Sequence, residues 1–231
     1  MFPDSDVPHH DDITKHGGRV RSFGHERGNW ASYVYTAFHP CEEFWDMLEE
    51  LESVARKHGI TLTKMEEFHI SLSQTVILRH HWINPFVQSL RDRLSSVRRF
   101  LCVADQLKVY VNKEKTRTFL GLEVVTGHQQ LLEVVSEVDK SLQEFDLETF
   151  YQGHRSYRPW FGTSASPEEN PSFHVSLAWC LGEVTKNLQG SCLLELQKVV
   201  DEFEDSDVLT RFYANEIRCK CGNKVMTIPL H

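Results

Sequence analysis

Two short segments decide how this chain folds: FHISLS at residues 68–73 and FHVSLA at residues 173–178. In both, apolar residues alternate with more polar ones, and this period of two predicts a β-strand with one buried face. The buried faces are expected to carry Phe68, Ile70, Leu72, Phe173, Val175, Leu177 and Trp179. The opposite faces are expected to carry His69, Ser71, Ser73, His174, Ser176 and Ala178. Each strand would therefore present an imidazole beside a hydroxyl, away from its apolar row.

The elements around the first motif recur in the same order around the second, which predicts two similar halves. The first half is predicted to contain strands at 32–38, 67–74 and 104–111 and helices at 41–57 and 83–97. The second is predicted to contain strands at 116–124 and 172–180, helices at 127–145 and 188–203, and a hairpin at 210–219 and 224–230. The first helix of each half begins at 41 and 127, which are 86 positions apart, whereas His69 and His174 are 105 apart. The second half therefore gains 19 residues before its motif.

The gain coincides with residues 153–170, a stretch rich in Gly, Pro and Ser without an apolar period, which predicts an inserted surface loop. Residues 1–25 also lack a period and are expected to form a loosely ordered lead-in. Residues 26–231 are predicted to form a single α+β domain. Its two pseudo-symmetric lobes, each an antiparallel sheet with outer helices, would face a central cleft where both histidines and both serines converge.

Composition and charge limit the class of protein. The chain has 231 residues and a formal net charge of −8, which argues against non-specific coating of nucleic acid, because that requires a positive face. The charge is uneven: residues 79–117 hold nine Lys or Arg and three Asp or Glu, whereas residues 41–67 hold three and eight. Such a locally basic side suits an enzyme that contacts a few phosphates. We find no candidate membrane span or secretory leader, so we expect a soluble intracellular protein without membrane contact.

Metal binding is not expected. The six cysteines lack the paired spacing of a zinc site and are predicted to be buried free thiols. His80 and His81 are adjacent and would point to opposite faces of a strand, and Cys219 and Cys221 have no second pair of ligands at zinc-finger spacing. The remaining histidine cluster, at positions 9, 10 and 16, lies in the lead-in.

The paired His-x-Ser motifs suit attack of a ribose 2′-hydroxyl on the adjacent phosphorus of RNA. One imidazole would take the proton of the 2′-hydroxyl and the other would protonate the departing 5′-oxygen, because an unperturbed imidazole has a pKa of about 6.5. The serine hydroxyls would hold the non-bridging phosphate oxygens, and no metal or other cofactor is required. A single His-x-Ser strand more often carries a structural, hydrogen-bonded histidine. Two copies at equivalent places favour an active site.

The motifs resemble those of the two-histidine (2H) phosphoesterase superfamily, whose bilobed α/β fold contributes one His-x-Ser/Thr strand from each half. Longer segments are similar to its U6 small nuclear RNA phosphodiesterase family. They are HGGRVRSFGHERGNWASYVY at 16–35, FHISLSQTVILRHHWINPFVQSLR at 68–91, EKTRTFLGLEV at 114–124, PSFHVSLAWCLG at 171–182 and EIRCKCGNK at 216–224. The resemblance spans nearly the whole chain from His16 onward.

This resemblance implies a metal-independent 3′-to-5′ exoribonuclease of the phosphorus–oxygen lyase type. It would trim the oligouridine or adenosine-ended 3′ tail of U6 small nuclear RNA and leave a 2′,3′-cyclic phosphate. His69 and His174 would then be catalytic, and Ser71 and Ser176 would bind the phosphate. We accordingly expect the RNA 3′ end as partner, a nuclear location and a monomer.

The resemblance also implies a pocket for the terminal base. The family stacks this base on a tyrosine in a Tyr-Gln context before the second motif, which matches Tyr151 and Gln152. Lys113, Pro171 and Ser172 would line the same pocket. The alternative for Tyr151 is that it covers a helix end. The compact family pattern has about one residue where this chain has 153–170, so the match departs from the family here.

Two other functions stay open from the sequence alone. One is a 2′,3′-cyclic phosphodiesterase or an RNA end-healing, ligase-type 2H enzyme, because the same four side chains could act on a cyclic end. The other is a non-catalytic module that binds RNA ends. The presence of histidine and serine in both motifs argues against this last possibility.

Overall fold

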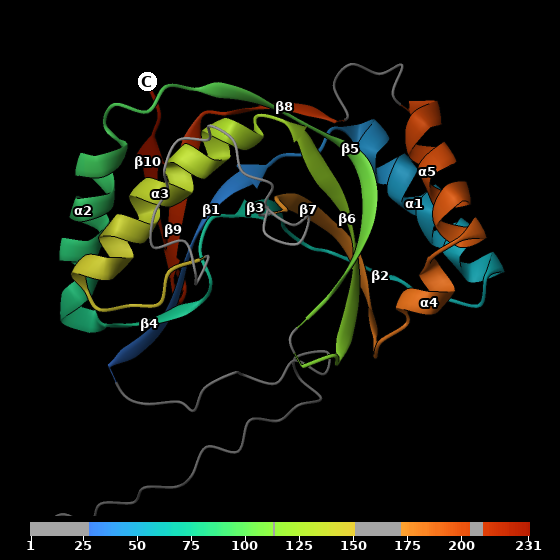
Figure 1. Cartoon of the computed structure of the whole chain (residues 1–231), viewed down its shortest axis with the longest axis horizontal. Helices are drawn as coiled ribbons and strands as arrows, with labels where there is room; N and C mark the ends of the chain where they lie inside the picture. The colour runs from blue at the N-terminus through green and yellow to red at the C-terminus, as the bar shows by residue number, and fades with distance from the viewer. Residues whose placement is uncertain (1–27, 113, 151–171, 204–209) are drawn as a thin grey trace, which may run out of the picture.

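The computed structural model describes residues 28–112, 114–150, 172–203 and 210–231 (Figure 1). Its strands are β1 (Asn29–Phe38), β2 (Thr63–Lys64), β3 (Phe68–Ser71), β4 (Val76–Arg79), β5 (Phe100–Val111), β6 (Arg117–Thr126), β7 (His174–Leu181), β8 (Arg211–Ala214), β9 (Glu216–Cys221) and β10 (Lys224–Pro229). Its helices are α1 (Glu42–Lys57), the 3₁₀ turn η2 (His80–Trp82), α2 (Ile83–Leu94), α3 (His128–Glu144), α4 (Thr185–Leu188) and α5 (Ser191–Phe203). The described residues thus form an α+β fold, as predicted.

The described strands form one antiparallel sheet. Its main path has the order β10-β9-β1-β3-β7-β6-β5-β8, with β4 beside β1 and β2 beside β7. Two separate sheets, one in each lobe, were expected, and on this point the prediction is wrong. The strands β3 and β7 join the two groups through the pair Ile70 and Val175. The two motif strands therefore lie at the middle of a continuous sheet.

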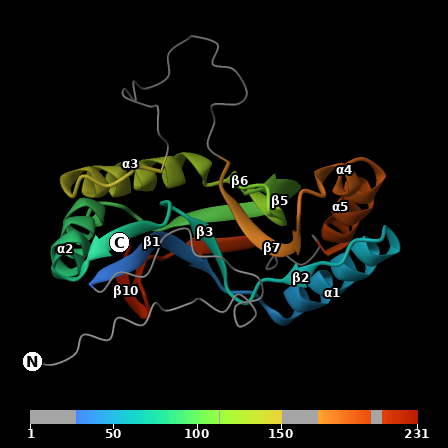
Figure 2. The same cartoon turned by 90° about the horizontal axis from the view of Figure 1, so that it is seen from below.

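The β3–β7 junction divides the sheet into two groups of strands, and each group contains strands from both predicted halves. The strand β5 of the first half pairs with β6 of the second, and the hairpin β9–β10 of the second half pairs with β1 of the first. The helices are exchanged in the same way: α1 packs against α5 at one end of the molecule and α2 against α3 at the other (Figures 1 and 2). The two halves are therefore repeats along the sequence, but neither half corresponds to one of the two groups of strands in the sheet.

The pairing register has the same offsets as the sequence. His69 lies opposite Ala37 in the β1–β3 ladder, and His174 lies opposite Glu123 in the β6–β7 ladder. Positions 37 and 123 are 86 apart and the histidines are 105 apart, which are the two offsets found in the sequence. The motifs thus occupy equivalent places on either side of the β3–β7 junction.

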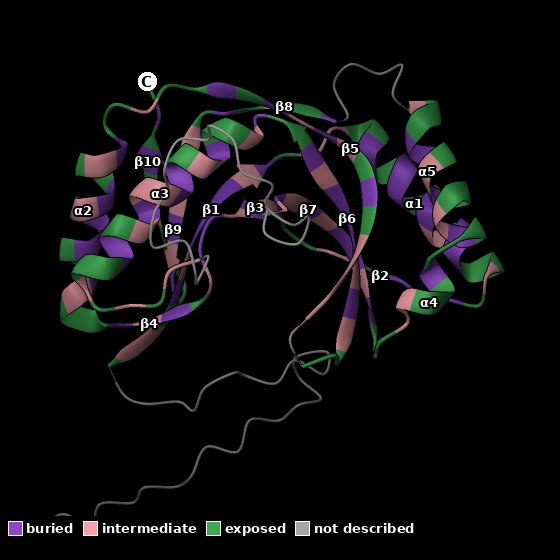
Figure 3. Ribbon diagram, viewed as in Figure 1, coloured by how far each residue is buried: buried purple, intermediate pink, exposed green. Residues whose placement is uncertain are grey.

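The long helices each bury one apolar stripe against the sheet, with their exposed residues on the outer side (Figure 3). The stripe of α1 consists of Phe44, Met47, Leu48, Leu51, Val54 and Ala55. The ring of Phe44 lies 4.9 Å from that of Phe38 and 5.1 Å from that of Phe68, measured between centroids. Burial of one such side chain contributes about 1.5–3 kcal/mol. The first motif strand is therefore held from its apolar side by α1 and β1.

Several predicted boundaries differ from the structure. The strand expected at 67–74 ends at Ser71. Ser73 was expected on the polar face but is buried, and its hydroxyl oxygen accepts a hydrogen bond from the Val34 N–H at 2.8 Å. The strand β4 follows and was not expected, whereas α2 ends at Leu94 instead of residue 97. The strand expected at 210–219 is two strands, because β8 pairs with β5 and β9 pairs with β1.

The cysteines agree with the prediction of free thiols. All six cysteines are free; Cys41 is half-buried and the other five are buried. In the part of the chain that the structure describes, no helix has the length and apolar character needed to cross a membrane.

Candidate active site

The two His-x-Ser motifs lie on the neighbouring strands β3 and β7, with their central residues paired. In an antiparallel register, the next positions on either side put His69 opposite Ser176 and Ser71 opposite His174. Opposite side chains on one face have Cβ atoms roughly 5 Å apart, and diagonal ones roughly 7–8 Å apart. Each histidine is therefore beside the serine of the other motif, and the two histidines are diagonal neighbours.

The burial of these residues agrees with the predicted faces. Ile70 and Val175 are 0% and 1% exposed, whereas both motif histidines and both motif serines are half-buried. The apolar row thus anchors each motif in the core. The imidazoles and hydroxyls keep partial access to solvent, which a site for a soluble substrate requires.

His174 is held by an aromatic ring and a backbone carbonyl. The ring of Tyr110 stacks on the imidazole with a centroid distance of 3.8 Å and an interplanar angle of 17°. The imidazole Nδ1 lies 3.2 Å from the backbone oxygen of Ser172, so an N–H on Nδ1 can donate to this carbonyl. That bond leaves Nε2 to exchange protons with a substrate. Burial lowers the pKa of His174, opposed by the Ser172 hydrogen bond and the Glu123 carboxylate.

A hydrogen-bonded chain supports this arrangement. The Ser172 hydroxyl donates to Glu123 Oε1 at 2.7 Å and lies 3.0 Å from the Tyr110 hydroxyl. The other oxygen of Glu123 is paired with the Lys108 ammonium. Burial raises the pKa of Glu123, but hydrogen bonds from Lys108 and Ser172 and the Lys108 charge together bring it below its ordinary value. The carboxylate near His174 is therefore ionised at neutral pH.

Gly121 makes room for the stacked pair of Tyr110 and His174. A Cβ atom at this position would lie 3.1 Å from a backbone oxygen of β7 and 3.2 Å from atoms of each of the two rings. Such contacts are tighter than most real ones, so a side chain would displace a ring or a strand. At the equivalent position of the first repeat, 86 residues earlier, the chain has Tyr35.

His69 has a different environment. The ring of Tyr35 meets the imidazole edge-on at a centroid distance of 5.2 Å. Lys220 pairs with Glu67 at 3.3 Å nearby. The pKa of His69 is lowered, mainly by burial; the positive charges of Lys220 and His174 act in the same direction, and Glu67 opposes them. The repulsion between the two imidazoles reflects their closeness.

A β-bulge changes the face of Trp179. In the β6–β7 ladder, Ser176 and Ala178 pair with adjacent residues of β6, so Leu177 is one extra residue in β7. The alternation shifts beyond it: Ala178 is 4% exposed and faces the core, while Trp179 is half-buried on the face of Ser176. The predicted faces of Ala178 and Trp179 are therefore wrong. Trp179 lies on the same side of the sheet as the motif histidine.

The other predicted site residues fall into two groups. Lys113, Tyr151, Gln152 and Pro171 lie outside the described residues, as do the insert at 153–170 and the lead-in at 1–25. Ser172 is described, and its carbonyl and hydroxyl contact His174, Glu123 and Tyr110. Its observed contacts thus orient other site residues.

Three supporting residues, Lys108, Tyr110 and Glu123, were not singled out from the sequence. Glu123 could be placed only once the pairing was known, since it lies 86 positions after Ala37, the partner of His69. No sequence signal pointed to Tyr110, because its contact with His174 depends on β5 crossing to the strands of the second half.

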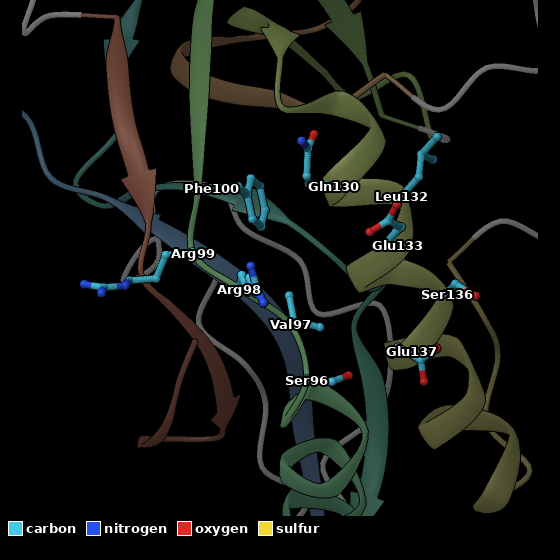
Figure 4. Close-up of a pocket in the computed structure, with 10 residues that line it drawn as sticks. All are labelled: Ser96, Val97, Arg98, Arg99, Phe100, Gln130, Leu132, Glu133, Ser136 and Glu137. Atoms are coloured by element: carbon cyan, nitrogen blue, oxygen red, sulfur yellow. The ribbon is translucent and has the colours of Figure 1, made fainter. Parts of the chain in front are cut away.

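A separate hollow of about 580 Å³ lies between the segment 96–100 and α3 (Figure 4). Its lining residues are Ser96, Val97, Arg98, Arg99, Phe100, Gln130, Leu132, Glu133, Ser136 and Glu137. No motif residue lines it. It is therefore not part of the candidate active site.

Comparison with known proteins agrees with the motifs and the fold. A family described as "HVSL: Uncharacterised conserved protein" matches residues 2–229. Those four letters are also the sequence of residues 174–177 here. The chain is similar to the U6 snRNA phosphodiesterase 1 of Xenopus laevis, with 65% identity over 220 residues that cover 95% of this chain and 81% of the relative. It is similar to the protein of the same name from Homo sapiens, with 51% identity over 230 residues that cover 100% and 80%.

Among solved structures, the chain is similar to Kluyveromyces marxianus Usb1 with uridine monophosphate. The TM-score is 0.59 and the sequence identity 17%, over 88% of this chain and 99% of that chain. At this identity the likeness shows a shared fold. The identity to the animal proteins, over most of their length, shows the family. The chain therefore belongs to the HVSL family and, within it, to the U6 snRNA phosphodiesterase 1 family.

Proposed function

We propose that this protein is a 3′-to-5′ exoribonuclease that shortens the uridine- or adenosine-ended 3′ tail of U6 small nuclear RNA. The reaction is a transesterification that needs no metal and leaves a 2′,3′-cyclic phosphate. The names of the relatives support the substrate, and a nuclear location follows from it. The protein acts as a monomer, with the RNA 3′ end as its partner.

The observation that carries this proposal is that each motif histidine lies opposite the serine of the other motif on β3 and β7. We call this the crossed arrangement. A phosphate between two diagonal imidazoles has one on the side of the attacking oxygen and one on the side of the leaving oxygen. The two serines lie between them and can each donate a hydrogen bond to a non-bridging oxygen.

The bond changes follow from this arrangement. One histidine, neutral at Nε2, takes the proton of the penultimate ribose 2′-hydroxyl as its oxygen forms a bond to phosphorus. The other histidine, protonated, gives its proton to the 5′-oxygen as the bond from that oxygen to phosphorus breaks. The products are a shortened RNA with a 2′,3′-cyclic phosphate and a free nucleoside. The histidine that acted as general base ends protonated, and the one that acted as general acid ends neutral. Proton exchange with water then returns both histidines to their starting states.

Shortening of a uridine-tailed RNA is expected to proceed fully in excess EDTA and to produce cyclic phosphate ends. The reason is that both proton transfers and the phosphate contacts come from protein side chains. The measurement is gel or mass-spectrometric analysis of the ends, with and without EDTA. Loss of activity in EDTA would contradict the metal-free reaction. Opening of a cyclic-ended RNA much faster than shortening of a cis-diol-ended one would instead favour a 2′,3′-cyclic phosphodiesterase.

The kcat/KM for RNA shortening is expected to be bell-shaped in pH, with its maximum on the acid side of about pH 6.5, the ordinary pKa of histidine. Burial lowers the pKa of both His69 and His174 in the free protein, so the protonated acid is lost at a lower pH than usual. The acidic and alkaline limbs of this pH profile report apparent pKa values of the two histidines as a coupled pair. Glu123→Gln removes a charge that raises the pKa of His174 and should shift the profile further to acid. A rate that still rises above about pH 7 would contradict the expected direction.

A further inference from the structure

A row of aromatic and cationic side chains continues from the candidate active site along β6 and β7. We call Arg117, Phe119 and Trp179 the Trp179 surface. Phe119 pairs with Trp179 across the two strands, and both are half-buried on the face that carries Ser176. The bulge at Leu177 is what turns Trp179 to this face. Without that extra residue the indole would point into the core.

Arg117 lies over the indole of Trp179. Its guanidinium carbon is 4.7 Å from the centre of the Trp179 ring system, within the range of a cation–π contact. Two nearby lysines are paired with acids: Lys108, on β5, with Glu123, and Lys115, between β5 and β6, with Glu183 at 3.4 Å. No acid of the described residues forms an ion pair with Arg117. Its charge is thus held in place by an aromatic ring.

The surface adjoins the reaction centre. Gly121, which pairs with Ser176, is followed on this face by Phe119 and then Arg117. Two residues along a strand span about 7 Å, which is a distance that one nucleotide can bridge. At the far end Leu181, the partner of Arg117, is 67% exposed. The Trp179 surface therefore runs from Ser176, in two steps along the strand, toward an exposed end of β7.

We propose that the Trp179 surface binds single-stranded RNA on the 5′ side of the scissile phosphate, at the nucleotide that precedes the attacking one. The base stacks on the indole or on the guanidinium plane held against it, and Arg117 also contacts a backbone phosphate. This rests on the proposed function. A 3′-to-5′ exonuclease has a single nucleoside on the 3′ side of the scissile bond, so a surface that extends two steps from the site fits the longer 5′ side.

Trp179→Ala is expected to lower kcat/KM for an oligouridine by about 5- to 100-fold, mainly through KM, since stacking on an aromatic contributes binding of that size. Cleavage of the dinucleotide UpU should stay near the wild-type rate, because UpU has no nucleotide before the attacking one. Trp179→Phe should restore much of the loss. Arg117→Gln should weaken oligouridine binding and make the slope of log affinity against log salt shallower by about 0.7. The matched control is Tyr213→Ala on β8, which removes an aromatic ring that is 63% exposed.

The possible outcomes distinguish a failure of this proposal from a failure of the proposed exonuclease function. Equal losses on UpU and oligouridine in Trp179→Ala, or an unchanged salt slope in Arg117→Gln, would overturn the surface proposal and leave the exonuclease intact. If Trp179→Ala does not fold, the Arg117→Gln and Trp179→Phe measurements decide. Failure of the wild-type protein to shorten either RNA would contradict the proposed function, and the surface proposal with it.

Discussion

Replacing His69 or His174 with alanine is expected to lower kcat for RNA shortening by about 10²- to 10⁴-fold, the usual contribution of one general acid or base. Each imidazole has one proton to move, and the other motif histidine already has the opposite role, so it cannot replace the lost one. The double variant should be little worse than either single one, because groups that act as a unit are not additive. The measurement is single-turnover cleavage of a labelled uridine-tailed RNA.

The matched control is His58→Ala. His58 is half-buried and lies 3.1 Å from Glu195, at the other end of α1 from the sheet junction. Its removal should leave kcat unchanged. Melting temperatures of all three variants should be compared, so that a loss of fold is not mistaken for a loss of chemistry. Full activity of either motif variant, folded, would exclude its imidazole from the reaction.

Much of the fold was predictable because it depends on local patterns. The period-two alternation identified both motif strands, and the apolar stripes identified the four long helices. The offset of 86 positions, read from the starts of the first helix of each half, reappears in the pairing of His69 with Ala37 and of His174 with Glu123. Local periodicity and repeat spacing therefore predicted that the histidine and serine of each motif share one face of the sheet, since both survive in the pairing register.

The exchange of elements between the halves was not predictable from those patterns. A strand such as β5 has the same alternation whether it pairs within its own half or with β6. The contact of Tyr110 with His174 depends on that choice, and so does the need for Gly121 beneath it. Likewise, a bulge adds a residue without changing composition, so the face of Trp179 could not be read from the alternation.

The crossed arrangement of the motifs also has a consequence for electrostatics. Because each serine lies beside the histidine of the other strand, a phosphate held by both hydroxyls bridges the two groups of strands at their single pair, Ile70 and Val175. Its negative charge would favour the protonated form of both imidazoles and oppose the effect of burial. The pKa values in the complex with RNA should therefore exceed those of the free protein, and the pH profile of kcat should lie to the alkaline side of that of kcat/KM.

Replacing Ser71 or Ser176 with alanine is expected to lower kcat by about 10²- to 10³-fold, the effect of removing one donor to an oxygen that gains charge in the transition state. Both side chains are half-buried on the face of the histidines. Threonine keeps the hydroxyl, so Ser71→Thr and Ser176→Thr should retain most of the activity. Measuring kcat and KM for the same tailed RNA separates this from a loss of ground-state binding, which would raise KM alone.

The crossed geometry adds a sharper expectation to these variants. Ser71→Ala removes the hydroxyl opposite His174, and Ser176→Ala removes the one opposite His69. Each serine should therefore couple more strongly to the histidine of the other strand than to that of its own motif. Double-mutant cycles over the four serine and histidine pairs measure this directly. Coupling that is larger within each motif than across β3 and β7 would contradict the crossed arrangement, whereas threonine variants as inactive as the alanine ones would show that shape, rather than the hydroxyl, is what the site requires.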